Sequence, residues 1–189
     1  MRRISRLILK SIGWQLDEQL PPHNRYVLIA YPHTSNWDFV LGMLAKWAMG
    51  MPLNWVAKHS MFWGPFGPLF IAMGGVPLNR STSVGFIEKN IKLFETREDF
   101  VLGIMPEGTR SKTERLKTGF YHIADGANVP LALGYLDYKH KKLGIGKVIE
   151  TTGDIDADFE IIKSYYMDKT GCKPLNQTRL TIKKNDDND

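Results

Sequence analysis

Two short segments of the chain combine residue types that could carry out chemistry. In HTSNWD, the imidazole of His33 is a candidate general base, and Asp38, five residues later, is a carboxylate that could orient it. In MPEGTRS, which follows a hydrophobic stretch, a glycine, a hydroxyl and a guanidinium stand side by side at Gly108, Thr109 and Arg110. Together the two segments indicate base-assisted acyl transfer to a phosphorylated alcohol.

The spacing of the first segment predicts a turn followed by a helix. On one continuous helix, five residues would separate the two side chains by about 140°. If a strand ends near Tyr31 and Ser35 or Asn36 caps the next helix, Asp38 falls in its first turn and folds back toward His33. The carboxylate then fixes the tautomer, and the other ring nitrogen is free to accept a proton. A satisfied structural His–Asp pair remains the alternative for this segment alone.

The chain offers no obvious nucleophile of its own. It contains no Gly-x-Ser-x-Gly motif, and its single cysteine, Cys172, lies in a polar stretch without a neighbouring histidine. We therefore expect the substrate hydroxyl to attack an activated acyl carbon while His33 removes its proton. Such base assistance typically contributes about 10²–10⁴-fold to a rate.

The second segment predicts a binding site for phosphate. Backbone N–H groups, the hydroxyl of Thr109 and the guanidinium of Arg110 are suitable partners for an anion. Glu107 could hold Arg110 or another cation in place. Further cations are candidates for the same anion, with Arg80 as a second guanidinium and with Lys58 and Lys117 as weaker choices.

The elements that must position these residues alternate between strand and helix. Strands are predicted at 26–31, 53–57 and 100–105, and a strand pair around a lysine-rich turn at 129–138 and 145–151. Helices are predicted at 39–49, 84–94, 119–128 and 158–168, and a broken helix at 65–73. This order predicts a single α/β domain with a mostly parallel central sheet covered by helices. The acyltransferase domain is expected to span 17–182, after an amphipathic segment at 1–16 and before a polar tail at 183–189.

Composition limits the partners. The 189 residues carry a formal net charge of +5, which favours a nucleic acid, a lipid headgroup or a phosphorylated small molecule. No nucleic acid is expected, because the lysines around 139–147 have no aromatic residues interleaved for stacking. One cysteine excludes an internal disulfide, and the acids at 154–158 are interpreted as helix caps because Phe159 replaces the glycine of a calcium loop. We expect no metal and no cofactor.

The N-terminal segment has the pattern of an interfacial helix. Four cations, Arg2, Arg3, Arg6 and Lys10, alternate with five apolar residues before the first acid at Asp17. A helix of this kind places its apolar stripe at the acyl boundary and its cations toward anionic headgroups. An ordinary amphipathic helix packed on the domain is the other interpretation. No signal-peptide pattern is present.

The stretch 61–78 is uncharged but interrupted by prolines and glycines, which would break a membrane-spanning helix. It is interpreted either as core or as a wall of an acyl-chain groove that also touches the bilayer.

The motifs resemble those of the glycerolipid acyltransferases typified by lysophosphatidate (1-acylglycerol-3-phosphate) acyltransferase. Four blocks occur in the order of that family, over about residues 25 to 135. They are His-x4-Asp at 33–38, Gly-x5-Arg at 74–80, Pro-Glu-Gly-Thr-Arg-Ser at 106–111 and Val-Pro at 129–130. Asn79 stands where the family often has Asp, and Met105 where Phe is usual.

The resemblance implies transfer of a fatty acyl group from acyl-CoA or acyl-carrier protein to the hydroxyl of a lysophospholipid. The expected acceptor is 1-acyl-glycerol-3-phosphate, which would give phosphatidic acid; another lysolipid or an amino-acid-based lipid is the alternative. The implied roles are base for His33, orienting partner for Asp38, phosphate binding for Arg80 and residues 107–110, and shaping of the acyl-donor side for Pro130. The implied location is the cytoplasmic face of the inner membrane, with a peripheral or monotopic attachment. A non-catalytic membrane-bound lipid-binding protein and a hydrolase are competing functions.

Overall fold

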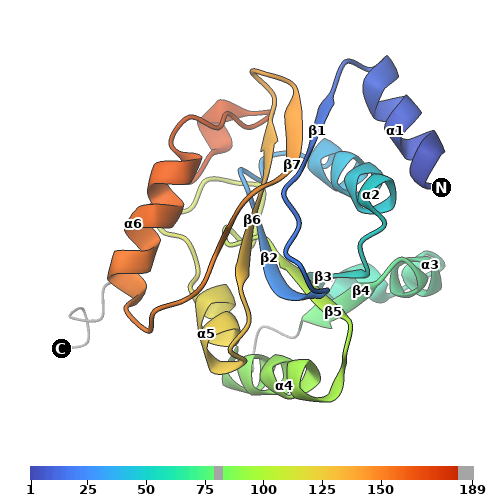
Figure 1. Cartoon of the computed structure of the whole chain (residues 1–189). Helices are drawn as coiled ribbons and strands as arrows, with labels where there is room; N and C mark the ends of the chain where they lie inside the picture. Colours follow the sequence, from blue (N-terminus) through green and yellow to red (C-terminus); the bar gives the residue numbers. More distant parts are fainter. Residues whose placement is uncertain (79–82, 183–189) are drawn as a thin grey trace.

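A seven-stranded sheet forms the centre of the molecule (Figure 1). The computed structural model describes residues 1–78 and 83–182, and the strand order within them is β1-β7-β6-β2-β5-β3-β4. The strands are β1 (Gln15–Glu18), β2 (Arg25–Tyr31), β3 (Leu53–Lys58), β4 (Gly75–Leu78), β5 (Phe100–Ile104), β6 (Leu131–Asp137) and β7 (Lys142–Ile149). All neighbours are parallel except β6 and β7, which form an antiparallel hairpin. The predicted mostly parallel α/β sheet is confirmed.

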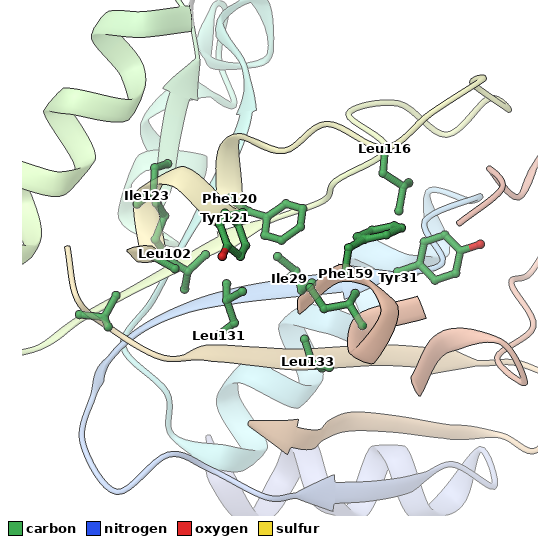
Figure 2. Packing of buried hydrophobic residues seen from close by; sticks show 14 of the residues in the cluster. Ile29, Tyr31, Leu102, Leu116, Phe120, Tyr121, Ile123, Leu131, Leu133 and Phe159 are labelled. Atoms are coloured by element: carbon green, nitrogen blue, oxygen red, sulfur yellow. The ribbon is translucent and has the colours of Figure 1, made fainter. Parts of the chain in front are cut away.

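Helices cover both faces of this sheet. They are α1 (Arg2–Ser11), α2 (Trp37–Met49), α3 (Gly67–Ala72), α4 (Ser83–Thr96), α5 (Gly119–Gly126) and α6 (Ile155–Tyr166), with short 3₁₀ turns η1 (His59–Phe62) and η2 (Pro174–Asn176). Side chains of α4, α5 and α6 pack on one face of β2, β5 and β6 (Figure 2). Side chains of α1 and α2 pack on the other face. The central strands are accordingly buried on both sides and are apolar almost without interruption.

Two strands were not predicted, and both lie at the edges of the sheet. β1 is polar and only four residues long, so its sequence carries no alternating apolar pattern. β4 contains Pro77 and belongs to the stretch 61–78, for which no strand was predicted. An edge strand tolerates proline because one side of its backbone needs no partner, and β4 pairs with β3 alone.

The ends of several helices also differ from prediction. α1 ends at Ser11, short of the expected boundary at residue 16, because the chain turns through Gly13 and enters β1. α6 begins earlier than predicted, because the carboxylate of Asp154 accepts hydrogen bonds from the backbone N–H groups of Asp156 and Ala157. This contact confirms that Asp154 caps a helix. Among the described residues, no helix is long and apolar enough to cross a bilayer.

Candidate active site

The first motif forms the loop between β2 and α2, at the carboxyl end of the central parallel strands. β2 ends at Tyr31 and α2 begins at Trp37, so the predicted turn between His33 and Asp38 is confirmed. The Oγ of Ser35 accepts a hydrogen bond from the backbone N–H of Trp37 (3.2 Å), the first residue of α2, and Asn36 is the N-cap residue. Ligand sites of open parallel sheets lie at this end of their strands.

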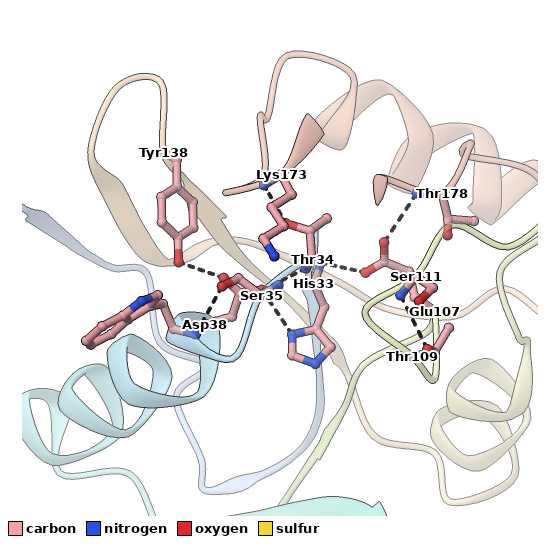
Figure 3. Close-up of polar contacts among 11 residues, drawn as sticks. His33, Thr34, Ser35, Asp38, Glu107, Thr109, Ser111, Tyr138, Lys173 and Thr178 are labelled. Atoms are coloured by element: carbon pink, nitrogen blue, oxygen red, sulfur yellow. Dashed lines mark hydrogen bonds and ion pairs between the residues drawn. The ribbon is translucent and has the colours of Figure 1, made fainter. Parts of the chain in front are cut away.

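Asp38 holds the loop together from the first turn of α2. Its Oδ2 accepts hydrogen bonds from the backbone N–H groups of Thr34 (2.7 Å) and Ser35 (2.9 Å), and lies 3.1 Å from Nδ1 of His33 (Figure 3). Burial alone would raise the pKa of Asp38, but the hydrogen bonds from His33, Tyr138 and Ser35 outweigh it and lower this pKa. An ionised Asp38 therefore faces Nδ1, and the expected pairing of base and carboxylate is present.

The opposite edge of the His33 ring faces open space. Within residues 1–78 and 83–182, Nε2 of His33 has no hydrogen-bond partner, and the side chain lines a cavity of about 860 Å³. General base catalysis requires an imidazole that is oriented through one ring nitrogen and presents the other to the substrate, and His33 has this arrangement.

Both cationic and apolar side chains line the cavity. Its polar lining includes, besides His33, Lys58, Thr109, Arg110, Lys117 and His122. Its apolar lining comes from β3, η1, α4, β5, α5 and the segment before α5: Val56, Ala57, Met61, Phe86, Ile87, Ile104, Met105, Leu116 and Phe120. A pocket of this size, mostly apolar with a few polar groups, suits an amphipathic ligand such as a lipid.

The second motif forms a tight turn after β5. The backbone N–H of Gly108 donates to the carbonyl of Met105 (2.9 Å), and Gly108 has a positive φ of 65°. A Cβ at Gly108 would lie only 3.3 Å from Cε and Nζ of Lys117, so a larger residue would press on this lysine. The turn therefore brings Gly108, Thr109, Arg110 and Lys117 to the same cavity wall, as expected for an anion site.

Glu107 does not take part in that wall. It is only 1% exposed, and its two oxygens accept hydrogen bonds from the backbone N–H groups of His33 (2.5 Å) and Thr178 (3.4 Å). This corrects the expectation that Glu107 holds Arg110 or binds substrate phosphate, because a buried carboxylate turned toward two amides is directed away from the solvent-facing guanidinium. Glu107 instead joins the two motifs to each other (Figure 3).

The environment of Glu107 also alters its protonation. Burial raises the pKa of this carboxyl to about 8, against the opposing effect of its two backbone hydrogen bonds. The negative charge of Asp38 raises it further. Near neutral pH, the protonated form of Glu107 is therefore favoured while Asp38 stays ionised.

Pro130 is placed far from the other predicted residues. Pro130 precedes β6, and the first residue of β6, Leu131, pairs with Val27 near the beginning of β2. Pro130 therefore lies at the opposite end of the strands from His33, which follows the last residue of β2. It lines a separate cavity of about 460 Å³. The structure therefore contradicts the expectation that Pro130 shapes the acyl-donor side of the site. Its carbonyl accepts a hydrogen bond from Val27 (3.1 Å), which gives it a role in strand pairing.

Arg80 lies outside the described residues, so its role stays a prediction. Among the residues that the structure does describe, no group of three or more His, Cys, Asp or Glu is arranged to hold a metal ion.

Residues near the C-terminus of the fold support the site and were not predicted. The hydroxyl of Tyr138, just after β6, donates to Oδ1 of Asp38 (2.7 Å). The backbone N–H of Lys173 donates to Oγ1 of Thr34 (3.0 Å), and Thr178 contacts Glu107. Of these three contacts, the sequence could have indicated only that of Tyr138, because Tyr138 follows a strand that is parallel to β2. No sequence pattern indicates the contacts of residues 170–180.

Comparisons with known proteins agree with this geometry. The family model described as Acyltransferase matches residues 12–133. The chain belongs to the acyltransferase family of enzymes. It is 35% identical over 105 residues to a 1-acyl-sn-glycerol-3-phosphate acyltransferase of Cocos nucifera, and the match covers 52% of this chain and 33% of that protein. This acyltransferase chain therefore spans about a third of the length of that relative.

The fold has a solved counterpart. The crystal structure of the 1-acyl-sn-glycerophosphate (LPA) acyltransferase PlsC from Thermotoga maritima superposes with a TM-score of 0.60, over 88% of this acyltransferase chain and 76% of that one. The sequence identity is 15%, so this likeness concerns the fold alone.

Proposed function

We propose that this acyltransferase moves a fatty acyl group from an acyl thioester to the free hydroxyl of a lysophospholipid, with 1-acyl-glycerol-3-phosphate as the acceptor and phosphatidic acid as the product. The observation that carries the proposal is the His33–Asp38 pair opening onto a cavity that also holds Arg110 and Lys117. The name of the relative from coconut points to the same acceptor.

The proposed reaction needs one base and no nucleophile from the protein. Nε2 of His33 takes the proton of the acceptor hydroxyl as its oxygen attacks the thioester carbonyl. The new ester C–O bond forms, the C–S bond breaks, and the leaving sulfur takes up the proton from Nε2 of His33, which restores the neutral base. Asp38 keeps Nδ1 protonated and stabilises the positive charge that develops on the imidazole.

The mixture of cationic and apolar residues that line the cavity supports an amphipathic acceptor. A phosphate near Arg110 and Lys117 would lie on the polar wall with His33, and a guanidinium can bind it with two parallel hydrogen bonds. Phe86, Ile87 and the neighbouring apolar residues offer space for an acyl chain. Arg80 is included in the proposal as a second guanidinium.

Attachment to the membrane surface is part of the proposal, and α1 supports it. α1 packs on the domain through Ser5 and Leu9, and Arg6 forms a two-point ion pair with Glu18 (2.6 and 2.8 Å). Its apolar stripe nevertheless faces outward, with Met1, Ile4, Leu7, Ile8 and Ile12 exposed. An ordinary packed helix would bury this stripe, whereas an interfacial helix places it in the acyl boundary. The proposed position is peripheral or monotopic, on the cytoplasmic face of the inner membrane.

The test is a transfer assay with a matched histidine control. The purified chain is incubated with vesicles that contain lysophosphatidate and with acyl-CoA or acyl-carrier protein in separate reactions. Released thiol and lipid products are measured, the latter by mass spectrometry. We expect His33→Ala to abolish both signals. His140→Ala is the control, because His140 also pairs with an aspartate (Asp137, 2.6 Å) but lies outside the cavity.

Each alternative function has its own outcome in this assay. Free fatty acid without new phospholipid would identify a hydrolase. Vesicle binding without turnover of any acceptor in a mixed lysolipid pool would identify a lipid-binding protein. Full activity of His33→Ala would contradict the proposed role of His33, and a different acylated product would name another acceptor.

A further inference from the structure

An exposed apolar surface lies beside the mouth of the catalytic cavity. It consists of Met61, Trp63, Phe66, Leu69 and Ile71, which are between 37% and 73% exposed. We call it the η1–α3 patch, after the two elements that carry it. Exposed apolar side chains gathered in this way are characteristic of a binding surface rather than of an ordinary protein exterior.

The outward position of these side chains does not result from loose folding. The same segment already packs an inner aromatic layer: the ring centroids of Phe62 and Phe70 each lie 5.9 Å from that of Trp55 in β3. A Cβ at Gly67 would collide with the carbonyl of Phe62, so the backbone is closely packed at this point. The segment thus has a packed inner side, formed by Phe62 and Phe70, and exposed apolar side chains on the remainder of its surface.

The patch continues directly into the cavity. Met61 belongs to both, since it lines the cavity and is itself exposed. Lys58, at the end of β3, also lines the cavity just before η1 begins. The patch therefore borders the apolar wall of the site, with a cation at the boundary.

We propose that the η1–α3 patch inserts into the bilayer beside the cavity and lets a membrane-resident acceptor enter the site sideways, without leaving the lipid phase. The inference rests on the proposed function and extends it by naming the route of the acceptor. It concerns a different element from the attachment through α1, which packs against α2.

The chemistry of the patch favours a lipid bilayer as its partner. The stretch 61–78 contains no Asp, Glu, Lys or Arg, so its insertion among acyl chains buries no charged side chain. Its tryptophan is suited to the interface, where an aromatic body meets headgroups, and Nε1 of Trp63 is already bonded to Nδ1 of His59 (3.0 Å). An acidic carrier protein would instead be attracted by cations, which this patch lacks.

Neighbouring elements on the same face of the sheet extend this surface. α2 lies between α1 and α3, and the rings of Phe39 in α2 and Phe70 in α3 contact each other (6.2 Å between centroids). α2 exposes Trp37 and Val40. α2 thus adjoins two other helices that expose apolar side chains, α1 and α3, as a surface lying against a membrane requires.

The test compares an acceptor held in a membrane with one in solution. The acceptors are long-chain lysophosphatidate in anionic phosphatidylglycerol vesicles and a short-chain, freely soluble lysophosphatidate without vesicles. Both are assayed with the same soluble short-chain acyl-CoA. The variant Trp63→Ser/Phe66→Ser removes the two most exposed aromatic rings of the patch, and Ile161→Ser/Met167→Ser is the control, with two exposed apolar residues of and beside α6.

The patch variant should lose about tenfold or more of its turnover with the vesicle-bound acceptor, because two large apolar side chains no longer enter the lipid. Its turnover with the soluble acceptor should stay within about twofold of the parent chain. The control variant should keep both. Equal loss with both acceptors, or no loss with either, would overturn the proposal, as would a dimer in size-exclusion chromatography that the patch substitutions dissociate.

A second readout is independent of catalysis. Trp63→Phe removes one tryptophan, so the difference in fluorescence between the parent chain and this variant reports on Trp63. Vesicles with brominated acyl chains should quench this difference signal, and an unquenched signal would overturn the insertion of the patch. If neither acceptor is turned over by the parent chain, the proposed function fails, whereas the quenching still decides whether the patch enters the bilayer.

Discussion

The hydroxyl of Tyr138 donates a 2.7 Å hydrogen bond to Oδ1 of Asp38, although the two residues are 100 positions apart. The other carboxylate oxygen, Oδ2, receives the hydrogen bonds of the motif loop and lies beside His33. Burial, the hydrogen bond to Asp38 and the charge of Asp38 raise the pKa of Tyr138 well above its usual value, so it remains a donor. Both oxygens of the carboxylate are thus fixed, which makes Tyr138 a positioning residue for the base.

Tyr138→Phe should slow the reaction without weakening substrate binding. Removing a hydrogen bond to a charged group costs about 1.5–3 kcal/mol, and a less firmly held Asp38 orients His33 less well. We expect kcat to fall about tenfold while KM stays about constant. The control is Tyr121→Phe, because Tyr121 donates an equally short hydrogen bond (2.7 Å) to Asp158 away from the cavity. Both variants should lose stability in urea, but an equal loss of kcat in both would show that Tyr138 acts only through the fold.

The contrast between Asp38 and Tyr138 indicates which parts of the site can be predicted from the sequence. The turn before α2 and the pairing of His33 with Asp38 could be predicted, because they follow from five residues of local spacing and helix capping. The strand order β6-β2-β5, which brings Tyr138 to the same edge, depends on which apolar strands pair. Hydrophobic periodicity and composition predict that β2, β5 and β6 are buried, but they do not predict the order of these strands within the sheet.

The two misplaced residues have a common physical origin. Glu107 stands among residues that face the cavity, and its neighbours Gly108 and Arg110 do line it. Whether a side chain in a tight turn points outward or inward depends on backbone dihedral angles that the sequence does not specify. Pro130 was assigned from the Val-Pro block of the family resemblance, but β6 runs parallel to β2, so the residue before β6 lies at the opposite end of the strands from His33. In both cases the residue type suggested a function, but the sequence did not specify where the side chain of Glu107 points or at which end of the strands Pro130 lies.

The raised pKa of Glu107 predicts a characteristic dependence of stability on pH. The folded chain holds this proton up to about pH 8, whereas the unfolded chain releases it near its ordinary value of 4.5. The stability contributed by the protonated group is therefore full below that value and lost as the pH rises to about 8. Glu107→Gln does not titrate, so the Tm of the parent chain minus the Tm of this variant should fall from about pH 5 to about pH 9.

The same variant should be the less stable of the two at low pH, because an amide has one acceptor oxygen for the two N–H groups of His33 and Thr178. Leaving one of these donors unsatisfied costs about 1–3 kcal/mol. Glu88→Gln, on the exposed surface of α4, is the control and should show neither effect. A difference in Tm that stays constant or grows with pH would contradict the assigned protonation of Glu107.

Arg110 should act through the phosphate of the acceptor. Arg110→Gln should raise KM for lysophosphatidate about tenfold, the loss of one charge-assisted contact. With monoacylglycerol, which has the same chain and hydroxyl but no phosphate, KM should not change. Lys117→Gln should behave in the same way with a smaller effect, because lysine offers a single point of contact. An equal rise in KM for both acceptors would place these residues on the acyl donor instead.

The cations of α1 divide into two groups, which allows electrostatic binding to the membrane to be tested without unfolding the helix. Arg2 and Arg6 bond to the carbonyl of Ala48, and Arg6 also pairs with Glu18. Arg3 and Lys10 form no ion pair within the described part of the chain. Substituting these two is preferable to removing residues 1–16, which would also cut into β1.

Arg3→Gln/Lys10→Gln should weaken binding to anionic vesicles about thirtyfold at low salt, since each cation near such a surface contributes about 1 kcal/mol. Lys89→Gln/Lys92→Gln makes the same change of charge on α4, which covers the opposite face of the sheet, and should bind like the parent chain. Cosedimentation between about 0.01 M and 1 M salt measures this, because the Debye length falls from about 30 Å to about 3 Å. The difference between the two variants should vanish at high salt, while a residual affinity remains from the apolar stripe of α1. If both pairs of substitutions weaken binding equally, net charge attracts the protein to the surface and α1 has no special part in it.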